Sequence, residues 1–501
     1  MLMPELKISE DIMKTKRALT VLSVLLISLS LFAQGTTETK EAVLEYTSDA
    51  SPKYIFMFIG DGMSSPQTNA AQVFGGVNEP GRIELDKLTF TQFPVVGIQY
   101  TQDSTSFCPD SASTATSLSS GFKTHSGVIG MGVDRVTKGV TIAEKLRDQK
   151  DFKIGIVSTV TLNHATPAAY YAHIASRNDY YEIGLQMAES GFDYFAGGSL
   201  LSADEGDKSL YEVLQDNGYT VTNDRDTILS LNSDSGKVYA VSPVLQEDGA
   251  MKYAVDATDD ELQLKDFVKK GIDVLYNEKG FFMMVESGKI DWAGHANDAV
   301  ANINDTLAFD EAIEVALEFA MNHPDETLIV VTGDHETGGM TIGYAATGYN
   351  TAFDILKNQK CSYVAFDEMV NAEIAAGDFT FTDLMAMVEE NFGLVAPDKE
   401  SQVDALVLDE YEYARLEKAY NDALTGNTDG YEESLLYGGY NPISVTLTHI
   451  INNKAGIGWT SYAHTGLPVP VYAFGEGSEL FYGAYDNTEV AKRLMALTDV
   501  Q

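Results

Sequence analysis

Two segments of this chain each combine a run of apolar residues with carboxylate and imidazole side chains placed just after it. Phe282–Ala296 reads FMMVESGKIDWAGHA, and Leu328–Gly339 reads LIVVTGDHETGG. The polar residues in question are Glu286, Asp291, His295, Asp334 and His335. Only 8 histidines occur in 501 residues, so two of them in such similar settings indicate binding of a divalent metal ion.

The spacing of these residues supports the metal hypothesis. Asp291 and His295 are four positions apart, so on a helix they face the same way. Asp334 and His335 are adjacent after a predicted strand, where either side chain can reach a cation. An Asp or His after a strand can also simply cap a helix, and for one pair alone that reading is the better one. It is disfavoured once Asp61, within Gly60–Gly62, is added at a third strand end.

A candidate nucleophile and a candidate anion-binding group lie elsewhere in the chain. The stretch CPDSASTAT begins at Cys108 and places Ser111 where a helix of small residues starts. Backbone N–H groups and the helix dipole favour an anion there. Arg177 is isolated in the uncharged stretch HIASRN, and arginine suits bidentate binding of phosphate. Taken singly, Ser111 reads as an ordinary capping serine and Arg177 as a surface residue.

Continuous apolar runs predict the strands that position these residues. Such runs are typical of a parallel sheet covered on both faces. The predicted strands are Tyr54–Ile59, Lys153–Val157, Phe281–Val285, Leu328–Val331 and Val469–Ala473. In open α/β sheets, ligands bind beyond the carboxyl ends of the strands, so residues scattered along the chain can converge there. His464 precedes the last of these strands instead of following one.

Helical segments alternate with the strands, which predicts an α/β fold: a three-layer sandwich with a largely parallel central sheet. The predicted helices are Thr141–Gln149, Tyr180–Ser190, Asp260–Tyr276 and Ile303–Asn322. Residues 349–440 break the alternation, because they are rich in Asp, Glu and Tyr and contain helical stretches at Asp383–Glu390 and Asp409–Ala423. We interpret them as an inserted helical and loop segment over the site or at an interface. A separate binding domain is disfavoured, since His464 and another strand follow.

The first 33 residues read as an export signal. Met13–Arg17 is basic, and Ala18–Phe32 is a mostly apolar, uncharged stretch of 15 residues. A membrane-spanning helix needs about 20 residues, so an uncleaved anchor is the less favoured alternative. The sequence therefore predicts a mature chain of residues 34–501 that is periplasmic or secreted.

Charge and cysteine content exclude some partners. The net charge of −41 argues against non-specific binding to nucleic acid, and no membrane-spanning segment is predicted. Cys108 and Cys361 are the only cysteines, which is no disulfide framework. We expect a free, buried thiol at Cys108, although pairing with Cys361 stays open.

Taken together, these motifs resemble the alkaline phosphatase family. The resemblance runs from about Lys53 to the C-terminus apart from the insertion, and its order of motifs is highly specific. The motifs are FIGDGM, PDSASTAT, HATPAAYYAHIASR, MMVESGKIDWAGHA, VVTGDHETGG and YAHTG. It implies metal-dependent hydrolysis of small phosphate monoesters at alkaline pH through a phosphoserine, which releases inorganic phosphate and an alcohol. Members of the family are commonly homodimers, and the oligomeric state of this chain stays open.

The resemblance also implies a role for each matching residue. Ser111 matches the serine that accepts the phosphoryl group, and Arg177 matches the arginine that binds phosphate. Two Zn²⁺ and one Mg²⁺ per chain are implied. The first zinc would take Asp291, His295 and His464; the second Asp61, Asp334 and His335; the magnesium Asp61, Thr166 and Glu286.

Two positions near the implied magnesium and phosphate depart from the best-known enteric bacterial pattern. His164 stands in place of an aspartate, and Trp292 in place of a lysine. In this respect the chain is similar to cold-active marine members of the family. Because the lysine cation is missing, we expect faster release of product phosphate and a more easily lost magnesium.

Three other functions compete with this one. A sulfatase of the same superfamily would need a Cys- or Ser-x-Pro-x-Arg motif, which the residues after Cys108 do not provide. A phosphodiesterase relative stays open, because a nearby pocket in the insertion could select diesters. A non-catalytic, metal-stabilised acidic protein is disfavoured by Ser111 lying with the strand-end residues.

Overall fold

The computed structural model describes residues 50–79, 81–426 and 430–501. The predicted export signal at residues 1–33 lies outside these described residues. Among the helices within them, none combines the length and the apolar character that crossing a membrane requires.

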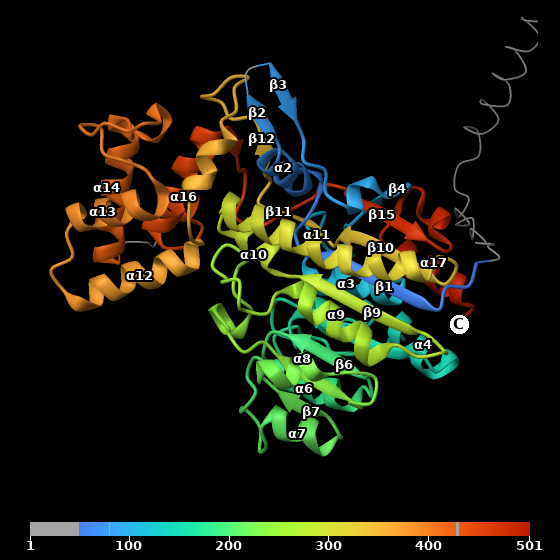
Figure 1. The fold of residues 1–501 in the computed structure, drawn as a ribbon. Coiled ribbons are helices and arrows are strands. Elements are labelled where there is room, and N and C mark those ends of the chain that lie inside the picture. The colour runs from blue at the N-terminus through green and yellow to red at the C-terminus, as the bar shows by residue number, and fades with distance from the viewer. Residues whose placement is uncertain (1–49, 80, 427–429) are drawn as a thin grey trace, which may run out of the picture. The chain divides into compact units, whose positions relative to one another are not determined.

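A ten-stranded sheet forms the centre of the molecule (Figure 1), and the five strands predicted from the sequence are its contiguous middle. In sheet order these are β15 (Val469–Gly475), β10 (Thr327–Gly333), β1 (Tyr54–Gly60), β9 (Phe281–Ser287) and β5 (Lys153–Ser158). β1, β9 and β10 are buried at every position, as their unbroken apolar sequences predict.

The outer strands of the sheet were not predicted. On the β15 side lie β4 (Val95–Tyr100) and β16 (Gly483–Asp486), and beyond β5 lie β6 (Tyr194–Gly197), β8 (Val238–Val241) and β7 (Thr220–Thr222). Most of them have three or four residues, too short for a clear apolar run. β16 follows β15 in the chain.

The sheet is parallel except for β15, which runs antiparallel to both β10 and β4. Thr332, at the carboxyl end of β10, pairs with Val471, near the amino end of β15. The reversal therefore brings the segment before β15 to the edge where the parallel strands end. This explains why His464 reaches the site although it precedes a strand.

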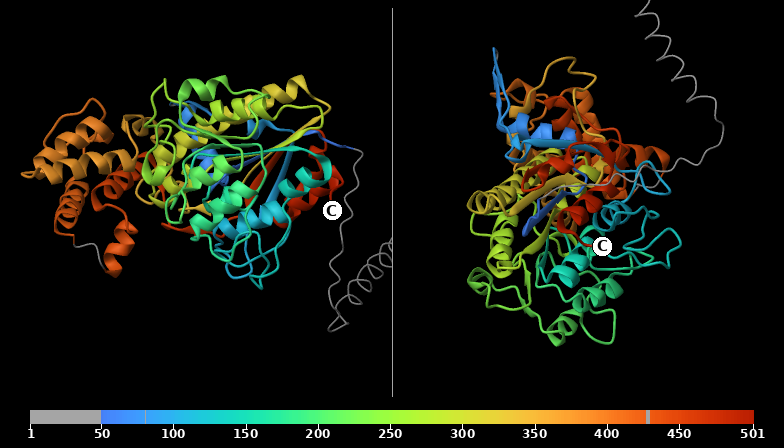
Figure 2. Two further views of the ribbon diagram at one scale, coloured as in Figure 1. Left: turned by 90° about the horizontal axis from the view of Figure 1, so that it is seen from below. Right: turned by 90° about the vertical axis from the view of Figure 1, so that its right-hand side faces the viewer.

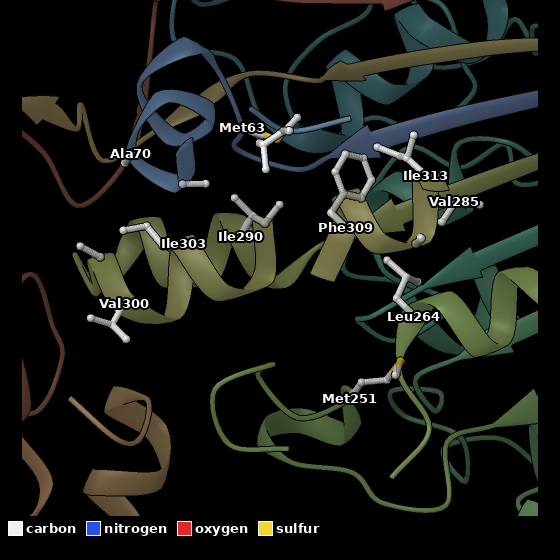
Figure 3. Packing of buried hydrophobic residues seen from close by; sticks show 14 of the residues in the cluster. Met63, Ala70, Met251, Leu264, Val285, Ile290, Val300, Ile303, Phe309 and Ile313 are labelled. Carbon is white, nitrogen blue, oxygen red and sulfur yellow. The ribbon is translucent and has the colours of Figure 1, made fainter. Parts of the chain in front are cut away.

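Helices cover both faces of the sheet, as the predicted three-layer sandwich requires (Figure 2). Along β1 the side chains alternate between two cores: Phe56 and Phe58 belong to one, and Ile55 and Met57 to the other. The first core contains α9 (Leu264–Leu275) and α11 (Ala299–Asn322), and Figure 3 shows Phe309 and Ile313 of α11 within it. The second contains α4 (Ile142–Lys150), α6 (Tyr180–Glu189) and α17 (Thr488–Thr498).

The four predicted helices are confirmed, with bounds that differ from the prediction by at most four residues. α9 begins four residues after the predicted Asp260, because Gln263 and Asp266 form a capping box at Leu264. α11 begins four residues before the predicted Ile303, because the Asp298 side chain accepts bonds from Val300 N and Ala301 N.

The described part of residues 349–440 contains four α-helices, three of which, α12, α14 and α15, pack against the helix that follows them (orange in Figure 1). They are α12 (Tyr363–Ala376), α13 (Phe381–Phe392), α14 (Glu410–Thr425) and α15 (Tyr431–Tyr437), followed by α16 (Pro442–Ala455). Asp298 anchors the start of α12, because its carboxylate accepts hydrogen bonds of 2.9 Å from Gln359 Nε2 and from Tyr363 N.

Two short antiparallel ladders join the chain before this segment to the chain after it. β11 (Glu336–Thr337) pairs with β14 (His464–Thr465), and β12 (Thr341–Ile342) pairs with β13 (Ile457–Gly458). The remaining helices and strands are α2 (Ser65–Gly75), β2 (Val77–Glu79), β3 (Arg82–Glu84), α3 (Ser111–Ser120), α5 (Ala165–Ala168), α7 (Leu210–Asp216), α8 (Arg225–Ser230) and α10 (Lys289–His295).

Both cysteines are free. Cys361 is buried, but Cys108 is exposed, so the expectation of a buried thiol there was wrong. The reason is local: Cys108 lies in the loop before α3, beside Phe107, which is 83% exposed.

Candidate functional site

A cavity of about 370 Å³ lies where the strand ends converge. Seven of the predicted site residues line it: Ser111, His164, Arg177, Asp291, Trp292, His295 and His464. The other five are buried beside it: Asp61, Thr166, Glu286, Asp334 and His335. Four residues that were not predicted complete the lining: Glu247, Asp248, Tyr363 and Tyr440.

Ser111 is the first residue of α3, and Asp110 is its N-cap. The Asp110 side chain accepts a bond of 3.1 Å from Ser113 N, which fixes the start of the helix. Ser111 Oγ lies 3.2 Å from His335 Nε2. The hydroxyl therefore faces the cavity at the positive end of a helix dipole, where negative charge on oxygen is stabilised.

Arg177 is held by two neighbours. Its Nη1 donates to Asp110 Oδ2 at 3.1 Å, and its Nη2 lies 3.3 Å from His164 Nε2. Burial opposes ionisation of Asp110, but Arg177 and several hydrogen bonds hold the pKa of that carboxyl below its usual range. A charged Asp110 thus orients the guanidinium, whose other N–H groups remain for an anion in the cavity.

A first group of possible metal ligands contains Asp291, His295 and His464. His295 Nε2 lies 3.4 Å from Asp291 Oδ2 and 3.1 Å from His464 Nε2, and His464 Nε2 lies 3.5 Å from Asp291 Oδ1. Asp291 and His295 share a face of α10, as their spacing predicts.

The backbone orients both rings of this group. His295 Nδ1 is 2.6 Å from Tyr462 O, and His464 Nδ1 is 2.6 Å from Pro109 O. Each Nδ1–H therefore donates to a carbonyl, which leaves the Nε2 lone pair aimed into the group, as in metal-binding histidines.

A second group contains Asp61, Asp334 and His335, all buried. His335 Nε2 lies 3.4 Å from Asp61 Oδ1 and 3.2 Å from Asp334 Oδ2. Asp334 is held in place by Gly62 N at 3.1 Å and Thr114 Oγ1 at 2.9 Å. The ligand atoms of this group lie within 4.8 Å of one another, and so do those of Asp291, His335 and His464. His335 is thus shared between the two neighbouring groups.

A third group of oxygen atoms lies against the second. Thr166 Oγ1 donates to Asp61 Oδ2 at 3.1 Å, and Ser158 Oγ donates to Glu286 Oε2. Glu286 Oε1 and Asp61 Oδ1 are buried and have no hydrogen-bond partner among the described residues. Buried carboxylate oxygens without partners are costly unless a cation binds them.

The charge balance of the site agrees with this. Burial and the neighbouring carboxylates raise the pKa of Asp61 well above its usual range. Burial also raises the pKa of Glu286 to about 8 and, together with Asp291, that of Asp334 to about 6. Several carboxylates that repel one another in a buried space form a site suited to divalent cations.

His164 and Trp292 lie together at the edge of the cavity. Their ring centroids are 5.9 Å apart at an interplanar angle of 77°. Burial and the Arg177 charge lower the pKa of His164 to about 3, so its ring is neutral. No cation stands at position 292; the nearby Lys289 ammonium instead lies 4.9 Å from the Trp292 ring centroid.

Of the four lining residues that were not predicted, only the two tyrosines had a signal in the sequence. Tyr363 and Tyr440 lie near the two ends of the 349–440 segment, whose richness in tyrosine was visible. Glu247 and Asp248 belong to a short turn, Glu247–Gly249, that matches no motif. Nothing in the sequence points to them.

A hydroxyl nucleophile, an oriented guanidinium and cation-binding groups in one cavity form an arrangement suited to phosphoryl transfer. Comparison with known proteins agrees. The family model of alkaline phosphatase matches residues 52–194 and 199–500. Alkaline phosphatase 3 of Bacillus subtilis is 30% identical over 492 residues, which cover 96% of this chain and 96% of that protein.

Solved structures give the same result. The crystal structure of a cold-active alkaline phosphatase from a psychrophilic Shewanella species matches with a TM-score of 0.73 at 28% identity, covering 89% of this chain and 99% of that one. The alkaline phosphatase of Thermus thermophilus, 23% identical, shares the fold with a TM-score of 0.74 over 94% of this chain and 96% of its own. This chain therefore belongs to the alkaline phosphatase family of enzymes.

Proposed function

We propose that the chain hydrolyses small phosphate monoesters at alkaline pH through a phosphoserine on Ser111 and releases inorganic phosphate and an alcohol. The observation that carries this proposal is the position of Ser111. Its hydroxyl lies at a helix N-terminus, 3.2 Å from His335 Nε2, in the cavity that Arg177 also lines.

The residues fit two Zn²⁺ and one Mg²⁺. Asp291, His295 and His464 would hold one zinc, and Asp61, Asp334 and His335 the other. Asp61, Thr166 and Glu286 offer only oxygen atoms, as magnesium prefers. The partnerless oxygens Asp61 Oδ1 and Glu286 Oε1 support this assignment. Bound there, dications supply charge neutralisation for the phosphate and lower the pKa of hydroxyl groups beside them.

The chain's own residues perform the rest of the reaction. Ser111 Oγ loses its proton and forms a bond to phosphorus while the bond from phosphorus to the alcohol oxygen breaks, and the alcohol oxygen takes up a proton. Water then attacks phosphorus, the bond to Ser111 Oγ breaks, and Ser111 Oγ regains a proton as the water loses one. Arg177, held by Asp110 and His164, places its remaining N–H groups on two phosphate oxygens and keeps the phosphoryl group in line with Ser111.

We further propose the arrangement around this site. Residues 1–33 act as a signal peptide, and residues 34–501 form the catalytic domain in the periplasm or outside the cell. Residues 349–440 are an insertion, supported by the ladders that join the chain on either side of them. The family's homodimer is a further hypothesis for this chain, and neutral Trp292 supports rapid phosphate release of the cold-active kind.

Turnover of p-nitrophenyl phosphate and of bis(p-nitrophenyl) phosphate, beside metal analysis of the same preparation, tests the proposal. We expect the monoester to be the better substrate by at least about 10²-fold in kcat/KM. Two zinc and one magnesium per chain, and loss of activity with chelator, are the further expected results. A preference for the diester would point to a phosphodiesterase, and full activity in metal-free protein would exclude the assigned site.

A further inference from the structure

Five of the residues that line the cavity take no part in the bond-making and bond-breaking steps proposed above. These are Glu247, Asp248, Trp292, Tyr363 and Tyr440, which we call the outer wall. They come from three separated parts of the chain: the turn after β8, helix α10 and the 349–440 segment. An alcohol esterified to a phosphate at Ser111 must lie in the same cavity and therefore beside this wall.

The aromatic members of the wall are fixed by their neighbours. Tyr363 and Tyr440 meet edge to face, with ring centroids 5.6 Å apart at an interplanar angle of 87°. Tyr363 also donates from its hydroxyl to the Glu247 carboxylate, at 3.2 Å from Oε2. Trp292 lies edge to face with His164. Rings held in this way offer π surface to a ligand at little cost in side-chain entropy.

The acidic members leave one negative charge in excess. The Lys289 ammonium lies 3.6 Å from Glu247 Oε2 and offsets that carboxylate. Asp248 is exposed, and its carboxylate has no hydrogen bond or ion pair with any residue in the described part of the chain. The wall therefore combines aromatic rings with an uncompensated carboxylate.

The same cluster already holds one ammonium group. Lys289 is 0% exposed, and among the described residues its Nζ has no hydrogen-bond partner. Its Nζ lies 3.7 Å from the centroid of the Tyr253 ring and 4.9 Å from that of Trp292. Burial lowers the pKa of Lys289, and the Glu247 carboxylate opposes this shift. Ring faces and a carboxylate thus surround this amino group beside Trp292, the arrangement that aromatic cages use for quaternary ammonium ligands.

We propose that the outer wall selects phosphate monoesters whose alcohol carries an ammonium group, of which phosphocholine is the simplest quaternary example. The ammonium group binds between the rings of Trp292 and Tyr440 and the Asp248 carboxylate while the phosphate binds at Ser111 and Arg177. This inference rests on the phosphate monoesterase activity proposed above. It also implies that a second anionic group on the alcohol is disfavoured.

The test compares two substrates that differ only in charge. In 3,3-dimethylbutyl phosphate a carbon atom replaces the nitrogen of phosphocholine, so size and shape are kept. We expect kcat/KM to favour phosphocholine by at least about fivefold, since cation–π contacts and a nearby carboxylate act on the charged substrate only. Activity on p-nitrophenyl phosphate is measured in parallel: its absence would remove the proposed function, whereas its presence with equal rates on the matched pair would remove only this inference.

Variants of the wall locate the preference. Asp248→Asn and Tyr440→Leu should each lower the ratio of the two kcat/KM values by about threefold or more, because the ratio cancels any general effect on the reaction. Asp234→Asn removes the same charge from an exposed turn that does not line the cavity and should leave the ratio unchanged. A ratio that is unaltered in both wall variants would overturn the proposal. So would turnover of adenosine monophosphate that falls more than that of phosphocholine in Tyr440→Leu, since it would assign the rings to a nucleobase.

Discussion

The two ends of the cavity are built differently. At the inner end, Asp61, Asp334 and His335 are buried and follow directly from the ends of β1 and β10. At the outer wall, Tyr440 and Asp248 come from segments outside the sheet, and Asp248 is exposed. The sheet thus positions the candidate metal ligands, whereas the residues that we propose select the alcohol lie on segments that can change independently.

The largest expected effect comes from removing the nucleophile. Ser111→Ala should lower kcat/KM for p-nitrophenyl phosphate by more than about 10³-fold, because it removes the hydroxyl that we propose accepts the phosphoryl group. Acid-quenched enzyme should carry labelled phosphate in the unaltered chain and none in the variant. Ser120→Ala, at the other end of α3, is the matched control and should keep its activity. A phosphorylated Ser111→Ala protein would refute the assignment.

Metal removal should destabilise the protein through the inner end of the cavity and not through the outer wall. Without cations the inner carboxylates repel one another, so chelation should lower Tm by several degrees as well as abolish activity. Saturation at 100 times Kd corresponds to about 2.7 kcal/mol of stabilisation. Calorimetry with and without zinc and magnesium measures the shift. Asp248→Asn should show the same shift as the unaltered chain; a smaller one would mean that the outer wall also takes part in metal binding.

A positive charge at position 292 should change how tightly the product phosphate binds. Trp292→Lys should tighten inhibition by inorganic phosphate about tenfold, the equivalent of about 1.4 kcal/mol, because an ammonium then lies near the bound anion. Trp292→Leu removes the ring without adding charge and serves as the control. If the inhibition constant for phosphate is the same in Trp292→Lys and in the unaltered chain, position 292 does not control product release.

The smallest effect on activity is expected from replacing Asp298, which holds the start of α12 and with it Tyr363 of the outer wall. Asp298→Ala removes the N-cap of α11 and leaves Gln359 and the Tyr363 N–H without their acceptor. We expect a loss of about 2–4 kcal/mol in the free energy of unfolding and a loss of a few fold in kcat/KM for phosphocholine. Denaturant unfolding and kinetics measure the two.

Asp224→Ala, which removes the exposed N-cap of α8, is the matched control for that experiment. It should cost about 1 kcal/mol and leave the kinetics unchanged. An unaltered phosphocholine rate in Asp298→Ala, despite the lost stability, would show that Tyr363 does not depend on this anchor.

The inner end was predictable because each of its residues lies beside a long buried strand. The apolar runs before Asp61 and Asp334 are confirmed as β1 and β10, which pair in parallel from Tyr54 to Gly60. Parallel neighbours end at one edge, so the two carboxylates had to meet. Asp291 and His295 followed from helical spacing alone.

The remaining features depend on contacts that local sequence does not record. The direction of β15 follows from pairing with β10 and β4, and its apolar sequence is equally suited to either direction. Glu247 is held at the cavity by a hydrogen bond from Tyr363 and by an ion pair with Lys289, and both residues are distant from it in sequence. Exposure of Cys108 depends on the path of a surface loop.

The two ladders, β11 with β14 and β12 with β13, have a consequence for engineering. They pair Thr341 with Gly458, so the two ends of the segment between these residues are held side by side, whatever the length of the segment. The entropic cost of closing such a loop grows only slowly with its length. The segment between Thr341 and Gly458 can therefore be shortened, lengthened or replaced while the ladders hold its two ends. The residues around the cavity entrance can in this way be changed without changing those at the strand ends.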